Sequence, residues 1–261
     1  MKKLVLALTA VAAFSGSALA ADLAARPAYT KAPMMAEPIY NWTGFYIFGG
    51  AGGGVWDADS VSINAAGNAT SINQRSGGDG YFGTVGAGYD WQFNHSWVAG
   101  IFADGQFGSL RGNLNDATNA LSGTVKLQDT WAAGVRLGYL VAPNVYSYVN
   151  GGFTQSYWSG SQLTTPAGVP PTVSTSSFNR SGWFAGGGVE NNLNIFGISA
   201  PGWFMKTEYR AAYFDRATLA ETLIATGGPA GASTTFKPFV QTISTSLVYR
   251  FNWGGPVVAK Y

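Results

Sequence analysis

The sequence predicts an all-β fold, an eight-stranded antiparallel transmembrane up-and-down β-barrel, and three observations support this prediction. Aromatic residues make up 15% of the chain and charged residues only 11%, and the 36 glycines favour strands and turns over helices. Segments of alternating apolar and polar residues recur along the chain. The connections between these segments are alternately short and long, as in the barrels of outer membranes.

The N-terminus predicts export. Two lysines follow the initial methionine and precede an apolar run at Leu4–Phe14, and an A-L-A cleavage site ends at Ala20. We therefore expect a signal peptide over residues 1–20 that directs the chain across the inner membrane to the cell outer membrane. An uncleaved anchor is the alternative, which the proline-rich periplasmic linker expected over residues 21–41 disfavours.

Charge and cysteine content exclude several classes of function. The signal peptide holds two of the 15 basic side chains, so the mature chain balances its 13 acidic side chains, and nucleic acid is not expected as a partner. The chain has no cysteine, which excludes disulfides and thiol catalysis. With a single histidine as well, we expect no metal site and no cofactor.

Eight alternating segments follow the linker, each about 10–15 residues long, the length that a tilted strand needs to cross a bilayer. In chain order they are Trp42–Trp56, Gly80–Phe93, Trp97–Arg111, Val125–Leu140, Asn144–Ser159, Gly182–Asn192, Trp203–Tyr213 and Val240–Phe251. The apolar faces carry, in the same order, Ile47, Tyr89, Ile101, Leu137, Val149, Val189, Tyr209 and Leu247. The alternation also places Leu127 on the apolar face of the fourth segment.

The first segment is unusual in its glycines, Gly49, Gly50 and Gly52–Gly54. The run lacks the G-K-[ST] ending and the following helix of a nucleotide-binding loop. We expect these small residues to make room for long side chains inside a narrow barrel.

The seventh segment, W-F-M-K-T-E-Y-R-A-A-Y, has the strongest contrast between its two faces. Lys206, Glu208 and Arg210 share one face, and large apolar groups occupy the other. A soluble, lipocalin-like barrel would turn the apolar face inward. A membrane barrel would turn it outward to lipid and enclose the charges.

The inner face of the predicted barrel carries as many acids as bases. The charged residues are Asp90, Asp104, Glu190, Glu208, Arg136, Lys206, Arg210 and Arg250. Because buried charges must be paired, this set predicts an ion-pair network across the lumen. Eight strands leave an interior that side chains can fill, so we expect a largely plugged lumen; an ion path is the alternative.

The ends of the segments predict an asymmetric barrel. Tight turns are expected at 94–96 and 142–144, a connection of middling length at 193–202, and long polar loops at 57–79, 112–124, 160–180 and 214–238. Aromatic residues near the segment ends predict two girdles at the membrane interfaces. The girdle residues are Trp42, Trp91, Phe93, Trp97, Tyr139 and Phe251 at the periplasmic ends, and Trp56, Tyr81, Tyr157, Trp158, Trp183 and Tyr213 at the outer ends.

Catalysis is not expected. His95 lies in a predicted tight turn next to Ser96, and neighbours in sequence do not make a catalytic triad. Asp57, Asp59 and Asp79 in the outer loops offer a weak divalent-ion site, although solvated loop acids are the commoner explanation. We therefore predict that the protein is not an enzyme.

Several short motifs resemble one family in order and spacing. They are N-W-T-G-F-Y-I at Asn41–Ile47, G-Y-D-W-Q at Gly88–Gln92, A-D-G-Q at Ala103–Gln106, R-L-G-Y at Arg136–Tyr139, G-G-G-V-E at Gly186–Glu190, K-T-E-Y-R at Lys206–Arg210 and L-V-Y-R-F at Leu247–Phe251. Together they resemble the small outer-membrane β-barrel family of alphaproteobacteria, porin-like surface antigens with haemin-binding relatives.

The resemblance implies an outer-membrane barrel that supports envelope integrity and surface interactions. Its implied partners are outer-membrane lipid, the barrel-insertion machinery and envelope or host-surface components that meet the outer loops. A narrow porin-like channel for small solutes and an outer-loop binder of haem-like ligands are the alternatives.

The last strand is expected to carry the barrel-insertion signal at Ile243, Leu247, Tyr249 and Phe251. The chain departs from the family in continuing past Phe251 with a tail at residues 252–261.

Overall fold

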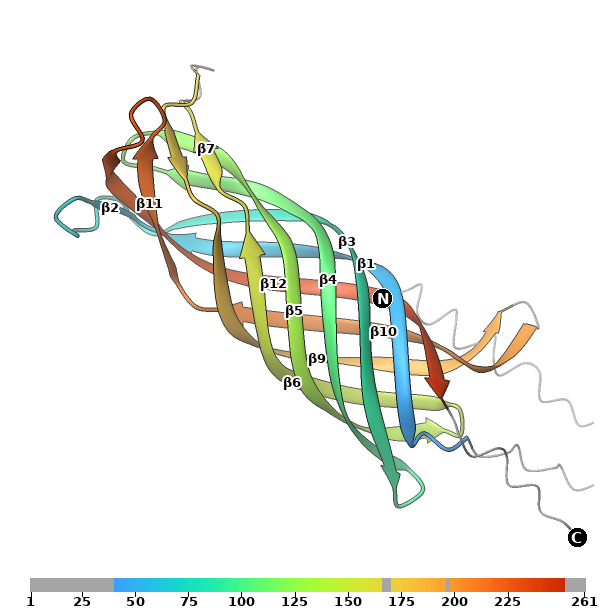
Figure 1. The fold of residues 1–261 in the computed structure, drawn as a ribbon. Helices are drawn as coiled ribbons and strands as arrows, with labels where there is room; N and C mark the ends of the chain where they lie inside the picture. Colours follow the sequence, from blue (N-terminus) through green and yellow to red (C-terminus); the bar gives the residue numbers. More distant parts are fainter. Residues whose placement is uncertain (1–39, 166–169, 196–197, 252–261) are drawn as a thin grey trace, which may run out of the picture. The chain divides into compact units, whose positions relative to one another are not determined.

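The computed structural model describes residues 40–165, 170–195 and 198–251, which form one antiparallel sheet of twelve strands (Figure 1). The strands are β1 (Gly44–Ser60), β2 (Ser62–Asn64), β3 (Gln74–Phe93), β4 (Trp97–Asp116), β5 (Leu121–Ala142), β6 (Val145–Trp158), β7 (Ser161–Leu163), β8 (Val173–Thr175), β9 (Phe178–Ile195), β10 (Ile198–Phe214), β11 (Ala217–Leu223) and β12 (Pro229–Phe251). The predicted signal peptide, the linker up to residue 39 and the tail lie outside the described residues. No helix in the described part of the chain is long and apolar enough to cross a membrane.

Eight long strands form a closed ring. Their order is β1, β3, β4, β5, β6, β9, β10 and β12, and β12 pairs back with β1 from Phe45↔Phe251 to Asp59↔Lys237. The predicted eight-stranded antiparallel up-and-down barrel is therefore confirmed. Closure matters because it leaves no free sheet edge in the membrane-spanning part.

In the part of the ring where β10 lies, the charged faces point inward and the apolar faces outward, as a membrane barrel requires. On β10, Lys206, Glu208 and Arg210 are buried inside the ring, while Tyr209 and Tyr213 are exposed on its outside. The lipocalin-like alternative, with the apolar face inward, is therefore wrong.

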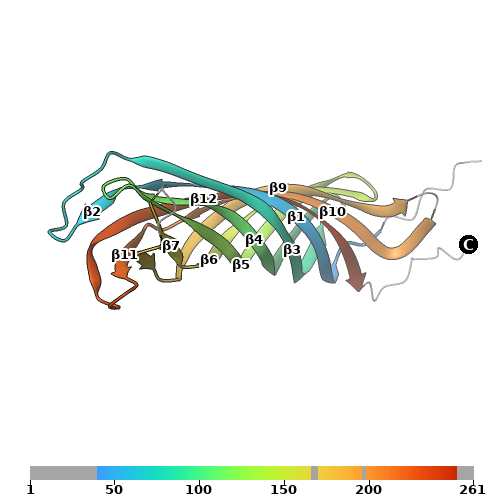
Figure 2. The ribbon, with the colours of Figure 1, turned by 90° about the horizontal axis from the view of Figure 1, so that it is seen from above.

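The predicted long polar loops are wrong in extent, because much of their length is strand. β4 and β5 continue until only residues 117–120 connect them, and β11 with the first part of β12 fills most of the stretch at 214–238. Figures 1 and 2 show β2, β7 and β11 at the same end of the ring, here called the extended end. Serine, threonine, asparagine, alanine and glycine are frequent in these stretches, and their moderate polarity hides the period of two.

Register irregularities reverse part of the predicted face assignment. The β4–β5 pairing shifts between Phe107 and Leu110, and the β5–β6 pairing shifts between Leu127 and Asp129. A one-residue slip moves side chains to the opposite face, so Leu127 faces inward and is buried, contrary to the prediction.

The opposite end of the ring carries the short connections. Asn94 and His95, with φ of 50° and 60°, form the turn between β3 and β4, which suits the positive φ of hairpin turns. β5 and β6 are joined through residues 143 and 144 as expected. The connection of middling length is shorter than predicted, because β9 continues to Ile195 and β10 begins at Ile198.

Most of the predicted girdle residues are exposed on the outside of the ring, and three are not. The exposed members are Trp91, Phe93, Trp97, Tyr139, Phe251, Tyr81, Tyr157, Trp183 and Tyr213. Trp42, Trp56 and Trp158 are at most 2% exposed and lie in the interior core, so their assignment to the girdles is wrong. Aromatic character alone does not distinguish a girdle residue from a core residue.

Candidate functional site: the filled interior of the ring

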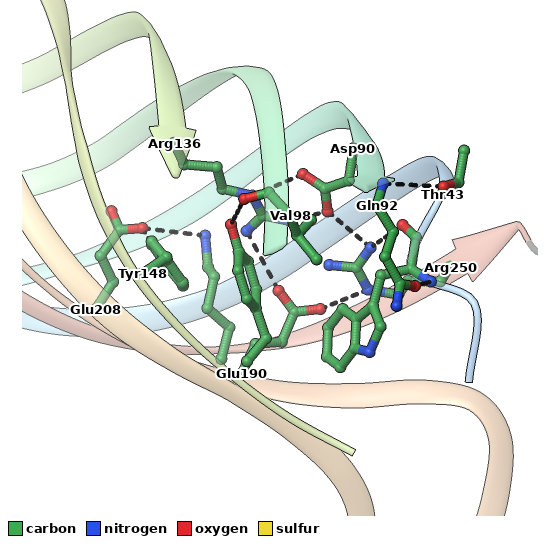
Figure 3. Close-up of polar contacts among 12 residues, drawn as sticks. Thr43, Asp90, Gln92, Val98, Arg136, Tyr148, Glu190, Glu208 and Arg250 are labelled. Atoms are coloured by element: carbon green, nitrogen blue, oxygen red, sulfur yellow. Dashed lines mark hydrogen bonds and ion pairs between the residues drawn. The ribbon is translucent and has the colours of Figure 1, made fainter. Parts of the chain in front are cut away.

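A closed cycle of four charges crosses the ring near its short-turn end (Figure 3). Arg136 donates to Asp90 at 2.9 and 2.5 Å and to Glu190 at 3.2 Å. Arg250 donates to Glu190 at 2.7 Å and to Asp90 at 2.8 Å. These side chains come from β3, β5, β9 and β12, so this first charge cluster links strands from around the ring.

A second charge cluster is built mainly on β10. Arg210 donates to Asp104 at 2.9 and 2.6 Å and to Glu208 at 2.8 Å. The Lys206 ammonium lies 3.7 Å from Glu208, and the Tyr148 hydroxyl donates to the same carboxylate at 2.8 Å. The structure thus brings all eight predicted lumen residues into ion pairs, but in two separate clusters, each with two acids and two bases.

Aromatic rings pack against the cations of both clusters. The guanidinium of Arg136 lies 4.2 Å from the ring centre of Tyr46, and that of Arg250 lies 4.4 Å from Trp42. The Lys206 ammonium lies 3.3 Å from the ring centre of Phe48. Cation–π contacts of this kind strengthen when water is excluded, so the rings complete the solvation of the buried charges.

Glycines make the space that these groups occupy. A Cβ on Gly100 would collide with the Asp90 carboxylate, and a Cβ on Gly88 would collide with the Tyr46 hydroxyl. Glycines of β3 and β4 therefore make room inside the ring. The same expectation is wrong for Gly49 and Gly53 of β1, because an added Cβ there would make only ordinary contacts with neighbours such as Val85 and Tyr81 on the outside. In β1, an added Cβ on Gly52 would meet the Phe82 ring at 2.6 Å.

An apolar plug fills the interior toward the extended end. Its buried residues are Trp56, Leu110, Leu114, Val125, Leu127, Trp158, Leu163, Val173, Leu219 and Phe236. Trp158 packs against three other rings of this region. Its ring centre lies 5.3 Å from that of Trp56, 5.2 Å from that of Phe236 and 6.0 Å from that of Phe178. Sequence reasoning missed this plug because it assigned much of it to loops or to the outer face.

Side chains leave little space between the charge clusters and the apolar plug. A cavity lined by Phe82, Gln106, Leu127 and Thr242 has a volume of about 10 Å³, which is room for a single water molecule. The interior is therefore packed as a core, in keeping with the width of an eight-stranded ring.

Two buried carboxylates of the extended end were also missed. Asp116 is 1% exposed and Glu221 is 2% exposed. Burial raises the pKa of Glu221, the negative charge of Asp116 raises it further, and a hydrogen bond from Thr234 acts in the opposite direction. The sequence signal for them is slight, because both lie in stretches rich in serine and threonine.

The other candidate residues lie apart from the interior. Gln92 Nε2 donates to the carbonyl of His95 at 2.7 Å within the short turn. Asp57 pairs with Arg75 at 2.8 Å on the outside, and the backbone of Asp59 pairs with that of Arg75. Among the described residues, no three His, Cys, Asp or Glu side chains gather as a metal-binding group.

The residues of the predicted insertion signal lie on one face of β12. Ile243 is 58%, Leu247 48% and Phe251 37% exposed on the outside of the ring. The rings of Tyr249 and Phe251 meet edge to face with centres 4.9 Å apart. Their role in insertion stays a prediction.

Known proteins resemble this chain in sequence or in fold. No family model matches the chain. The 31 kDa outer-membrane immunogenic proteins of Brucella melitensis biotype 1 and Brucella suis biovar 1 are each 32% identical over 219 residues, which cover 80% of this chain and 85% of each relative. The outer membrane protein OprG from Pseudomonas aeruginosa has a TM-score of 0.51 at 12% identity, over 81% of this chain and 98% of that chain, and supports the fold alone.

The relatives and the ring with its exposed apolar outside lead to the same assignment. The relatives confirm the family expected from the motifs and the location in the outer membrane. The chain is an outer-membrane β-barrel surface protein, and it belongs to the family of the Brucella 31 kDa outer-membrane immunogenic proteins.

Proposed function

We propose that this protein supports envelope integrity and presents its extended end to the exterior for surface interactions, without catalysis and without an open pore. The observation that carries the proposal is the filled interior. Two neutral charge clusters and the apolar plug follow one another along the inside of the ring.

The charge clusters resist opening because each carboxylate is buried and paired with a basic side chain. Asp90 and Glu190 are both 0% exposed, and each accepts from both Arg136 and Arg250. Separating such a pair leaves an uncompensated buried charge, which costs several kcal/mol per ion. A path for ions through the first charge cluster would have to break this cycle.

The outside of the ring supports a role in the membrane itself. Ile101, Val135, Val149 and Leu247 are at least 45% exposed there, on four different strands. Such an apolar band suits outer-membrane lipid as the main partner. By the usual orientation of these barrels, the extended end would face the exterior and the short turns the periplasm.

Planar-bilayer recording of the purified full chain tests the plugged lumen. We expect no stepwise conductance under conditions in which a wide porin conducts. Discrete conductance steps from the wild-type chain would favour the narrow solute channel instead. A haemin titration of the same preparation tests the ligand-binding alternative, which saturable binding would favour.

The envelope role needs a separate measurement. Cells that lack this chain should become more sensitive to detergent, and a plasmid copy of the wild-type chain should restore resistance. Unchanged sensitivity in the deletion strain would reject the role in envelope integrity while leaving the plugged lumen untouched.

A further inference from the structure

Two buried acids of the extended end differ from the other buried acids of the described chain. Asp90, Asp104, Glu190 and Glu208 each form ion pairs with arginine or lysine. Asp116 and Glu221 are equally buried, but no ion pair joins either of them to a basic side chain among the described residues. Four of the buried carboxylates are thus charge-compensated by basic side chains, and the other two are not.

The two carboxylates accept hydrogen bonds from one pair of directly opposite hydroxyl side chains. Ser62 and Thr234 are directly paired on β2 and β12, which brings their Cβ atoms to about 4.5–5.5 Å. Ser62 Oγ donates to Asp116 Oδ1 at 2.6 Å, and Thr234 Oγ1 donates to Glu221 Oε1 at 3.1 Å. Both carboxylates are therefore held next to the same cross-strand pair.

The hydrogen bonding of the two groups is unequal. Asp116 also accepts from the backbone N–H of Thr118 at 3.0 Å and from Asn119 Nδ2 at 2.6 Å. Both oxygens of Asp116 therefore have hydrogen-bond donors. Glu221 Oε2 is buried and has no hydrogen-bond partner among the described residues.

A positive charge would stabilise this arrangement. Burial raises the pKa of Glu221, and the negative charge of Asp116 raises it further, because two neighbouring carboxylates repel each other when both are ionised. A proton on Glu221 would remove one charge but would leave a buried donor in place of a buried acceptor. A cation beside Glu221 Oε2 satisfies both the charge and the unpartnered oxygen.

We propose that Asp116 and Glu221 bind a calcium ion at the extended end. The available ligand atoms are carboxylate and hydroxyl oxygens, which hard cations prefer. Among the described residues, no His or Cys side chain joins the two carboxylates, as a transition-metal site would favour. Calcium accepts six to eight oxygens in flexible geometry, so the hydroxyls of Ser62 and Thr234 and water would complete its shell.

The proposed site is weak and ties several elements together. With two carboxylates and no third acid gathered among the described residues, a Kd of about 10⁻⁴–10⁻³ M is expected, as in extracellular calcium modules. Its residues come from β2, the end of β4, β11 and β12. Calcium would therefore stabilise the extended end, and its removal would destabilise this end before the rest of the ring.

Calorimetric titration of the purified full chain with calcium chloride, after treatment with a chelator, tests the proposal. We expect one saturable site in the wild type and at least tenfold weaker binding in Glu221→Gln. Asp57→Asn is the matched control, because Asp57 is an outward-facing acid that pairs with Arg75, and it should bind like the wild type.

Protease cleavage of the turn at residues 224–228 is the second measurement. Calcium should slow this cleavage in the wild type and in Asp57→Asn, but not in Glu221→Gln. Heat-modifiable mobility on gels shows whether Glu221→Gln folds. If it does not fold, the calcium titration of the wild type alone tests the proposal. The absence of saturable binding in the wild type, or cleavage that depends on pH but not on calcium, would overturn the proposal.

Discussion

The interior of the ring is charged near the short turns and largely apolar toward the extended end, and the outside shows the opposite order. On β4, Ile101 is outside and Asp104 inside, whereas further along the same strand Arg111 is outside and Leu114 inside. On β5, Val135 is outside with Arg136 inside, and further toward the extended end Lys126 is outside with Val125 inside.

This reversal is explained by the solvent outside the ring. Where lipid surrounds the strands, the outer face must be apolar, and the polar groups satisfy one another inside. Where water surrounds them, burial of apolar area inside is favourable, as in a soluble barrel. The register shifts near Phe107 and Leu127 lie at the transition, so the same strands serve both environments.

The largest expected effect comes from breaking the first charge cluster. Arg136→Met leaves Asp90 and Glu190 with Arg250 alone, and a loss of about 3–5 kcal/mol in unfolding free energy is expected for removing one partner of a buried pair. Urea unfolding in detergent micelles measures it. The double variant Arg136→Met/Glu190→Gln restores charge balance and should recover part of the loss; no recovery would contradict the importance of neutrality.

Removing a ring from the apolar plug should have a large but local effect. Phe236 is fully buried and packs against Trp56, Trp158 and Phe178, so Phe236→Ala should cost about 3–5 kcal/mol of local stability. Faster protease cleavage of the extended end, with unchanged heat-modifiable mobility of the ring, is the expected readout. Phe236→Leu should cost less, and equal destabilisation of the whole ring by Phe236→Ala would show that the two regions unfold together.

An arginine introduced on the outside of the ring should have different effects in the lipid-facing part and near the extended end. Ala133 is exposed on the lipid-facing part of β5, and Ala133→Arg should cost about 2–4 kcal/mol and impair assembly in the outer membrane. Ala133→Leu is the control for size. Asn113 is exposed on the outside of β4 near the extended end, so Asn113→Arg should be tolerated. Equal loss of stability and assembly in the two arginine variants would place the lipid boundary elsewhere.

The smallest effect is expected at the exposed ion pair of Arg75 and Asp57. Its 2.8 Å contact is as short as those inside the ring, but the Arg75 side chain is 73% exposed. Because water screens such a pair, Arg75→Ala should leave the urea midpoint unchanged within error. A shift comparable with that of Arg136→Met would show that distance rather than burial controls these pairs.

Much of the candidate site was predictable because the inward residues follow a period of two. Lys206, Glu208 and Arg210 share a face in any extended strand, whatever its partners. Their division from Arg136 and Arg250 into a separate cluster was not predictable, because it depends on register and on which strands meet across the ring. The cation–π partners Trp42 and Phe48 were hidden for the same reason.

The sequence by itself determined the number of ring strands, their antiparallel order and the charged inner face, because alternation and turn chemistry are local properties. Only the tertiary structure decided where the alternation reverses, how Leu127 and Trp158 come to lie in the apolar plug, and which buried carboxylates of the described residues form no ion pair with a basic side chain. These features depend on ring closure and register, which bring together residues such as Asp116 and Glu221 that are far apart in the chain.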